Sequence, residues 1–196
     1  MIAATNNDHK LIEIRDILKD TGVRILSLKD IGLDIEVEEN GSSFEENALI
    51  KAREICKATG QATMADDSGL EVAALDGAPG IRSARYSGET GALKDKKNNE
   101  KLLANLEGVP AENRDARFCS AVAAVFPDGR EFVVKGFVYG KIGFAEAGHN
   151  GFGYDPLFIV DGYGKTMAEL GAEVKNKISH RSNALKEFVQ KIKEYI

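Results

Sequence analysis

The sequence contains no apolar run long enough to cross a membrane, so we expect no membrane-spanning helix. It opens MIAATNNDHK, without a basic segment followed by an apolar core, so we expect no signal peptide and a cytoplasmic location. Positive charge is also limited, because 26 Lys and Arg against 31 Asp and Glu give a net charge of −5. This balance argues against a protein that binds nucleic acid mainly through phosphate contacts, but it allows a pocket for one nucleotide.

Cysteine is scarce as well. Cys56 and Cys119 lie far apart in the sequence, and without a secretory signal we favour reduced core residues over a disulfide. The chain also lacks internal repeats, low-complexity tracts and long linkers. Its composition, with 43% hydrophobic and 29% charged residues, is that of an ordinary globular protein. We therefore expect residues 1–196 to form a single domain.

Several familiar signatures of catalysis or cofactor binding are missing. The sequence has no dinucleotide-binding glycine fingerprint, no Walker A sequence and no serine-hydrolase nucleophile elbow. His9, His149 and His180 show no paired spacing of the kind that zinc sites use. Any chemistry must therefore come from other patterns.

The apolar residues that are present predict interleaved strands and helices. Leu11, Ile14 and Leu18 have helical spacing, and Ser43 with Glu46 forms a capping-box pattern that opens a helix near Phe44. The predicted strands cover about residues 2–4, 23–28, 62–65, 116–126 and 131–142, with turns at 77–80 and 127–130. The predicted helices are completed by 94–106 and by 179–195, whose apolar stripe is Leu185, Phe188, Val189, Ile192 and Ile196. This order predicts an α/β or α+β domain built on a mixed sheet.

Three of these helices place cations or amides on their inward faces. Asn7 and Lys10 extend the stripe of the first helix, Lys51 shares the apolar face of the second, and His180 and Arg181 precede the stripe of the last. One explanation is that these long side chains reach past the core to water. The other is a shared anionic ligand, which helix N-termini also favour.

The segment MADDSGLEV places two adjacent carboxylates, Asp66 and Asp67, between short apolar stretches. We expect the strand over 62–65 to end at this pair. Asp-Asp-Ser-Gly is good turn chemistry, and it is also a source of the oxygen ligands that Mg²⁺ prefers. In GFGYDP, residues 151–156, glycines flank Phe152, which fits either a ring on which a base stacks or a plain core residue.

Six sequence blocks occur in order from the first predicted strand to the last predicted helix. They are ATNNDHKLIEI, FEENALIKA, ADDSGLEVAALDGAPGIRSARYSG, GFGYDPLF, GKTMAEL and ISHRSNALKEF. Together they closely resemble the inosine triphosphate pyrophosphatase family, the dITP/XTP pyrophosphatases. The resemblance implies Mg²⁺-dependent hydrolysis of deaminated purine nucleoside triphosphates (ITP, dITP, XTP) to a monophosphate and pyrophosphate, which removes them from the nucleotide pool. It also implies an elongated mixed sheet with flanking helices, two lobes around a central cleft, and a homodimer.

The resemblance further implies roles for particular residues. Asp67 would be the proton acceptor for the attacking water, and Glu39 and Asp67 would be the metal carboxylates. The phosphate-binding segment would be Thr5, Asn6, Asn7, Asp8, His9 and Lys10, with Lys51 as a further phosphate contact and Ser68 touching the substrate. Phe152, Gly153, Tyr154 and Asp155 would line the base pocket, with Phe152 stacking, and Lys175, His180 and Arg181 would read the base edge.

One position departs from the family pattern, because many relatives have Gly where Asn6 stands. Asn is the residue other than Gly that best tolerates a left-handed backbone, so we expect the loop to be retained. Two other functions remain open: a nucleotide-binding regulatory protein without catalysis, and a phosphatase that removes the terminal phosphate. Retention of both Glu39 and Asp67 argues against the first, and product identity would separate the second.

Overall fold

The computed structural model describes residues 1–195, and the chain divides into two compact units. Unit 1 comprises Met1–Asp67, Ser120–Gly136 and the chain from His180 onward, and unit 2 comprises Ser68–Cys119 and Phe137–Ser179. The six strands of the sheet follow the order β2-β1-β3-β4-β5-β6. Strands β3, β4 and β5 each contribute residues to both units.

The strands form a mixed sheet, as predicted. They are β1 (Ile2–Ala3), β2 (Leu26–Ser27), β3 (Thr63–Val72), β4 (Asp115–Val125), β5 (Glu131–Ile142) and β6 (Phe158–Val160). Strand β1 runs parallel to β2 and β3, whereas β5 and β6 are antiparallel. Strand β6 was not predicted, and only two residues of the predicted strand over 23–28 are extended and paired.

Two helices of unit 1 begin at side-chain caps, and the start of the second, at Phe44, is the one that the sequence pattern predicted. Helix α1 (Asp8–Leu18) is capped by Asn7, whose side chain accepts a hydrogen bond from the Lys10 amide at 3.2 Å. Helix α2 (Phe44–Thr59) is capped by Ser43, whose hydroxyl accepts from the Glu46 amide at 3.1 Å. Asn and Ser are favoured at this position because they satisfy one of the free N–H groups of the first turn.

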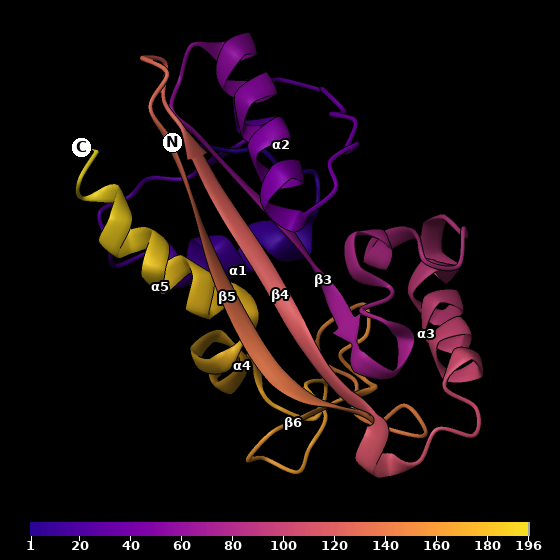
Figure 1. Ribbon diagram of the computed structural model, residues 1–196. Helices are drawn as coiled ribbons and strands as arrows, with labels where there is room; N and C mark the ends of the chain where they lie inside the picture. The colour runs from indigo at the N-terminus through magenta and orange to yellow at the C-terminus, as the bar shows by residue number, and fades with distance from the viewer. Residues whose placement is uncertain (196) are drawn as a thin grey trace. The chain divides into compact units, whose positions relative to one another are not determined.

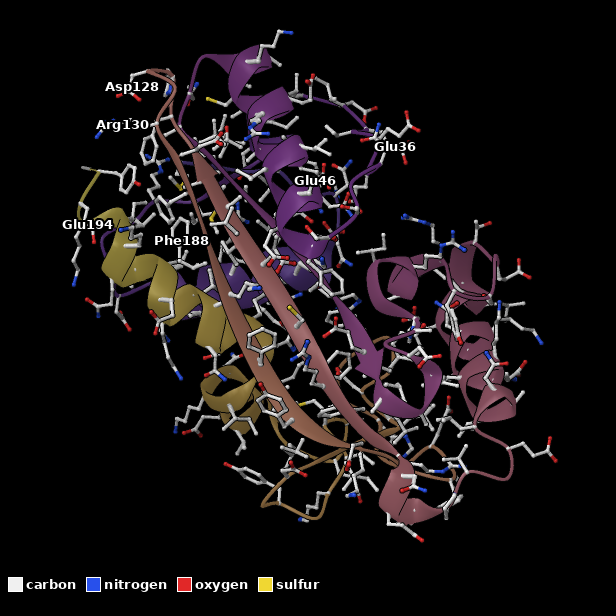
Figure 2. All side chains as sticks on the ribbon, in the orientation of Figure 1. Glu36, Glu46, Asp128, Arg130, Phe188 and Glu194 are labelled. Atoms are coloured by element: carbon white, nitrogen blue, oxygen red, sulfur yellow. The ribbon has the colours of Figure 1, made fainter. Side chains whose placement is uncertain are left out.

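Side-chain alternation places the helices of unit 1 on opposite faces of its strands. Helix α1 and helix α5 (His180–Ile192) share one apolar core with β1, β3 and β4 (Figure 1). The members of this core include Ala3, Leu11, Ile14, Leu18, Met64, Val122, Ala124, Leu185 and Phe188. Phe188 on α5 (Figure 2) packs against Phe132 on β5, with 5.4 Å between the centres of the two rings. Helix α2 contacts the other face, through the Asp67 side chain described below.

Unit 2 has a separate apolar core. Its helices are α3 (Lys94–Asn105) and α4 (Ala172–Ile178), and its core includes Leu70, Leu102, Leu106, Ile142, Leu157 and Phe158. The centres of the Phe118 and Phe158 rings lie 4.6 Å apart. Across residues 1–195, the described elements are completed by five short 3-10 helices: Lys29–Ile31, Ala73–Leu75, Gly80–Arg85, Gly91–Leu93 and Ala111–Asn113.

Some local predictions were wrong in an informative way. The chain does not turn at Asp66 and Asp67, because β3 continues through both residues to Val72. The segment before the last helix forms a helix of its own, α4, which Ser179 separates from α5. Ile196, which the predicted stripe included, lies outside the described residues. The hairpin turn at 127–130 is present, with the Arg130 side chain bonded to Asp128 (Figure 2).

Two predictions from composition can also be compared with the structure. Cys56 and Cys119 are both buried and are not joined in a disulfide, in agreement with the prediction of reduced core residues. In the described part of the chain, no helix combines the length and the apolar character that crossing a membrane requires.

Gly136 on β5 brings α5 onto the strands of unit 1. A Cβ atom at this position would lie 2.1 Å from the Ala184 backbone nitrogen and 2.3 Å from the His180 carbonyl oxygen. These backbone atoms belong to the first turn of α5 and cannot move independently. Gly136 therefore permits the close approach of the helix end that carries Arg181.

We expect Gly136→Ala to lower the free energy of unfolding by about 2–3 kcal/mol, because the added methyl group meets rigid backbone. Urea denaturation at pH 7 measures this change. Gly171→Ala is the matched control, since a Cβ there meets no atom within 4 Å and the backbone is not left-handed. An equal effect of the two substitutions would contradict the packing argument.

Candidate active site

The two adjacent aspartates of β3 face opposite sides of the strand. Successive side chains of a strand alternate, so Asp66 shares the side of Met64 while Asp67 points the other way. Asp66 accordingly contacts α1 and α5, and Asp67 contacts α2. The two aspartates therefore lie in two different polar environments, one on each face of β3.

Asp66 lies between two cations. Its Oδ2 atom is 2.7 Å from Lys10 Nζ on α1 and 3.3 Å from an Arg181 guanidinium nitrogen on α5. Its Oδ1 atom accepts a hydrogen bond from the Ser120 hydroxyl on β4. Burial alone would raise the pKa of Asp66, but the charges of Arg181 and Lys10 and the bonds from Lys10 and Ser120 outweigh it. They hold the pKa of this carboxyl well below its usual range.

These buried cations do not reach past the core to water. The exposed fraction of the side chain is 15% for Lys10, 11% for Lys51 and only 1% for Arg181. Arg181 also pairs with Glu13 on α1. Burial lowers the pKa of Lys10, against the opposing charge of Asp66. The fold itself therefore supplies a carboxylate for the cations of α1 and α5, which the helix stripes alone could not reveal.

Asp67 is held by helix α2. Its Oδ2 atom accepts a hydrogen bond from Asn47 Nδ2 at 3.1 Å, and its Oδ1 atom lies 3.5 Å from Lys51 Nζ. Lys51 also lies 2.9 Å from Glu39 Oε1 and donates to the Asp66 carbonyl at 2.8 Å. Burial raises the pKa of Asp67, although Lys51 and Lys10 act in the opposite direction. Despite burial, the charges of Asp67 and Glu39 raise the pKa of Lys51.

Glu39 and Asp67 fit a divalent cation. Both carboxylates contact one positive charge, the Lys51 ammonium, so they already surround a single cation. Within residues 1–195, no cluster of three or more His, Cys, Asp or Glu side chains suited to a metal comes together. Mg²⁺ typically takes one or two protein carboxylates and completes its shell with water and phosphate oxygens. The donor set of this pair is therefore suitable for Mg²⁺.

The segment before α1 and its first turn are organised by local hydrogen bonds. Thr5 accepts a hydrogen bond from the Asn7 amide at 3.1 Å, and Asn6 donates to the Ile35 carbonyl at 3.4 Å. Asp8 pairs with Lys29 at 3.0 Å on the surface. His9 is exposed on the first turn of α1. Lys10, the last residue of this predicted phosphate-binding segment, reaches the Asp66 cluster in the structure.

The predicted base-binding residues of unit 2 form one local cluster. Asp155 Oδ2 accepts from the Phe152 amide at 3.0 Å and from Lys175 Nζ at 2.8 Å. The Lys175 ammonium lies 4.7 Å from the centre of the Phe152 ring. Gly151 is required here, because a Cβ atom at that position would lie 2.0 Å from Asp155 Oδ2.

Tyr154 is buried beneath this loop, and its hydroxyl donates to the Ser83 carbonyl at 2.8 Å. Burial raises the pKa of Tyr154.

The remaining predicted residues divide between the units. Ser68 is the first residue of unit 2 on β3, whereas His180 and Arg181 open α5 in unit 1 and are buried. Arg181 contacts Glu13 and Asp66 in this structure, so its role in reading a base stays a prediction. Sequence reasoning missed Asn47, Ser120 and Glu13. Asn47 could have been found, because it lies one helical turn before Lys51 on the inward face of α2.

The profile of the Ham1 family matches residues 1–191. The chain belongs to the Ham1 family. The match includes both aspartates of β3, the Glu39–Lys51 pair and the loop around Phe152.

Curated relatives and solved structures of Ham1 proteins agree with this assignment. A dITP/XTP pyrophosphatase of Clostridium perfringens is 51% identical over 198 residues, covering 98% of this chain and 96% of its own. The dITP/XTP pyrophosphatase of Bacillus subtilis is 48% identical over 185 residues, covering 94% and 92%. The Ham1 protein of Staphylococcus aureus matches with a TM-score of 0.87 at 42% identity, covering 100% of this chain and 98% of that one.

We expect Asp66→Asn to lower the free energy of unfolding at pH 7 by about 3–5 kcal/mol, because Lys10 and Arg181 lose their shared buried partner. Urea denaturation measures this loss, with Asp115→Asn, in an exposed pair with Lys141, as the control that changes little. The folded pKa of Asp66 is depressed, so its stabilisation is complete above the unfolded pKa and disappears as the pH falls toward the folded value. The difference between wild type and Asp66→Asn should therefore shrink below about pH 4. Equal stability of the two proteins at pH 7 would refute this role.

Proposed function

We propose that this chain hydrolyses deaminated purine nucleoside triphosphates (ITP, dITP and XTP) to the monophosphate and pyrophosphate, and so removes them from the nucleotide pool. It is a nucleoside-triphosphate pyrophosphatase. The observation that carries the proposal is the pair Glu39 and Asp67 around the Lys51 ammonium, in a chain that matches the Ham1 family over residues 1–191. The curated relatives named above are dITP/XTP pyrophosphatases.

The reaction is an attack of water on the α-phosphorus. The new bond joins the water oxygen to this phosphorus, and the bond to the oxygen that bridges to the β-phosphorus breaks, so pyrophosphate leaves. Asp67 accepts the proton of the water, and Asn47 keeps one carboxylate oxygen engaged while the other faces Lys51. The ammonium groups of Lys10 and Lys51 neutralise charge on the triphosphate, held by residues 5–10 at the N-terminus of α1.

Glu39 and Asp67 would hold Mg²⁺, which when bound offsets negative charge on the phosphate oxygens and on the leaving group. Ser68 would touch the substrate beside this pair. Because burial raises the pKa of Asp67, its carboxylate takes up a proton more readily than an exposed one. We further propose that the protein acts in the cytoplasm and as a homodimer, on the basis of the family resemblance.

Unit 2 would recognise the base. Hypoxanthine and xanthine present an oxygen at position 6, which accepts a hydrogen bond, whereas adenine presents an amino group. A cationic donor such as Lys175 fits the oxygen and would be left unpaired against adenine, and such a mismatch gives strong rejection. Phe152 would stack on the base, with Gly153, Tyr154 and Asp155 shaping the pocket. The family resemblance also assigns reading of the base edge to His180 and Arg181, which belong to unit 1.

Product analysis tests this function directly. The purified protein is incubated with ITP, XTP, dITP, GTP and ATP, with Mg²⁺ or with EDTA, and pyrophosphate and orthophosphate are quantified separately. We expect pyrophosphate from ITP, dITP and XTP only, and only with the metal. Orthophosphate would instead indicate removal of the terminal phosphate, and binding without any product would indicate a regulatory protein.

Asp67→Asn tests the assignment of the proton acceptor. We expect kcat to fall by about 10²–10⁴, the usual contribution of a general base. Stability at pH 7 should not fall, because a raised folded pKa means that the ionised form of Asp67 opposes folding, and Asn removes that charge. Steady-state kinetics and urea denaturation measure the two effects, with Asp34→Asn, at an exposed position of unit 1, as the matched control. Normal turnover by Asp67→Asn would exclude the assigned role.

A further inference from the structure

The loop that carries Phe152 contains two glycines, which raise the entropic cost of ordering it. Gly151 and Gly153 both have left-handed backbone, with φ values of +78° and +61°. Glycine loses more conformational freedom on ordering than any other residue, so a loop with two glycines around an aromatic ring has a high entropic cost of ordering. The Asp155 bond to the Phe152 amide offsets part of this cost, and further contacts with Gly153 would offset more of it.

Helix α3 holds both polar groups of the Gly153 backbone. Asp95 Oδ2 accepts a hydrogen bond from the Gly153 amide at 2.9 Å, and Asn99 Nδ2 donates to the Gly153 carbonyl at 3.2 Å. Asp95 and Asn99 are four residues apart and therefore lie on the same face of the helix. We name this pair of contacts the α3 clasp.

Two donated hydrogen bonds fix the orientation of the Asn99 side-chain amide. Its Nδ2 group also donates to Glu146 Oε1 at 2.7 Å, so both amide protons are used on oxygen acceptors. If the side-chain amide were rotated by half a turn, its oxygen would face the Glu146 and Gly153 oxygens and both hydrogen bonds would be lost. In the described part of the chain, Asn99 Oδ1 is buried without a hydrogen-bond partner. A buried, unsatisfied acceptor opposes folding, so stability alone does not explain an asparagine at this position.

We propose that Asp95 and Asn99 are positioning residues for base recognition: the α3 clasp orders the Gly153 backbone and so fixes the Phe152 ring. This inference rests on the proposed function. A binding surface that is ordered in advance avoids the cost of ordering it when the ligand binds. The clasp therefore acts on nucleotide affinity and base discrimination, and leaves the chemistry at Asp67 unchanged.

Four variants of α3 test the proposal. Asp95→Ala removes the acceptor for the Gly153 amide, and Asn99→Asp replaces the donor with a carboxylate that faces two oxygen acceptors. Asp95→Asn retains an oxygen acceptor and is the conservative rescue. Asn105→Ala is the matched control, because Asn105 lies on the same helix but bonds the Tyr86 hydroxyl at the surface. For each variant, kcat and KM are measured with ITP and ATP, and amide hydrogen exchange is measured over residues 151–155.

We expect Asp95→Ala and Asn99→Asp to raise KM for ITP about five- to ten-fold, the effect of one lost hydrogen bond, with kcat within about two-fold of wild type. The ratio of kcat/KM for ITP over ATP should fall, and the loop amides should exchange faster. Asp95→Asn and Asn105→Ala should retain wild-type KM values.

Unchanged KM and discrimination in Asp95→Ala and Asn99→Asp, with only a lower melting temperature, would reduce the clasp to a structural contact and overturn the proposal. A fall in kcat at constant KM would overturn it as well. If wild type itself hydrolyses no ITP, the proposed function has failed, which is a separate result from an active wild type whose variants behave normally.

Discussion

The Asp66 carboxylate connects four elements of unit 1: it lies on β3, and its partners come from α1, α5 and β4. Moving a charge out of water opposes folding strongly unless partners replace the lost hydration. Lys10, Arg181 and Ser120 provide that replacement, and Gly136 allows the first turn of α5 to come close enough to β5. The arrangement of these two helices on this face of the strands thus depends on one carboxyl group.

Asp67 shows how a neighbouring residue of the same type acquires different properties. Strand geometry turns the Asp67 side chain toward α2. There the buried carboxylate accepts a hydrogen bond from the neutral amide of Asn47 and lies near the Lys51 ammonium, which also contacts Glu39. The pKa of Asp66 is depressed and that of Asp67 is raised, although the two residues are adjacent. Carboxyl groups whose pKa values are driven apart by their surroundings commonly have separate duties in an active site. Here Asp66 would stabilise the fold and Asp67 would accept a proton.

Local patterns in the sequence predict much of this structure. The stripe of Leu11, Ile14 and Leu18 and the Ser43 cap are local signals, and α1 and α2 follow them. The end of β3 was predicted too early, at Asp66 and Asp67, because the Ser-Gly after them is turn chemistry, whereas their burial in β3 depends on partners distant in sequence. Arg181 illustrates the limit: its inward position was predictable, but Asp66 and Glu13 are 115 and 168 residues away. Strand β6 is three residues long, too short for a periodic signal.

The division of the chain into interleaved segments has a consequence for biosynthesis. Unit 1 draws on the first 67 residues, on Ser120–Gly136 and on α5, while the whole of unit 2 is translated between residue 67 and α5. A nascent chain whose α5 is still inside the ribosome has Asp66 and Lys10 outside but lacks Arg181. Until α5 has been synthesised and has left the ribosome, the emerging protein must keep a carboxylate-bearing strand and the apolar face of α1 without their final cover. Such partly covered surfaces are the usual targets of chaperones that bind during synthesis.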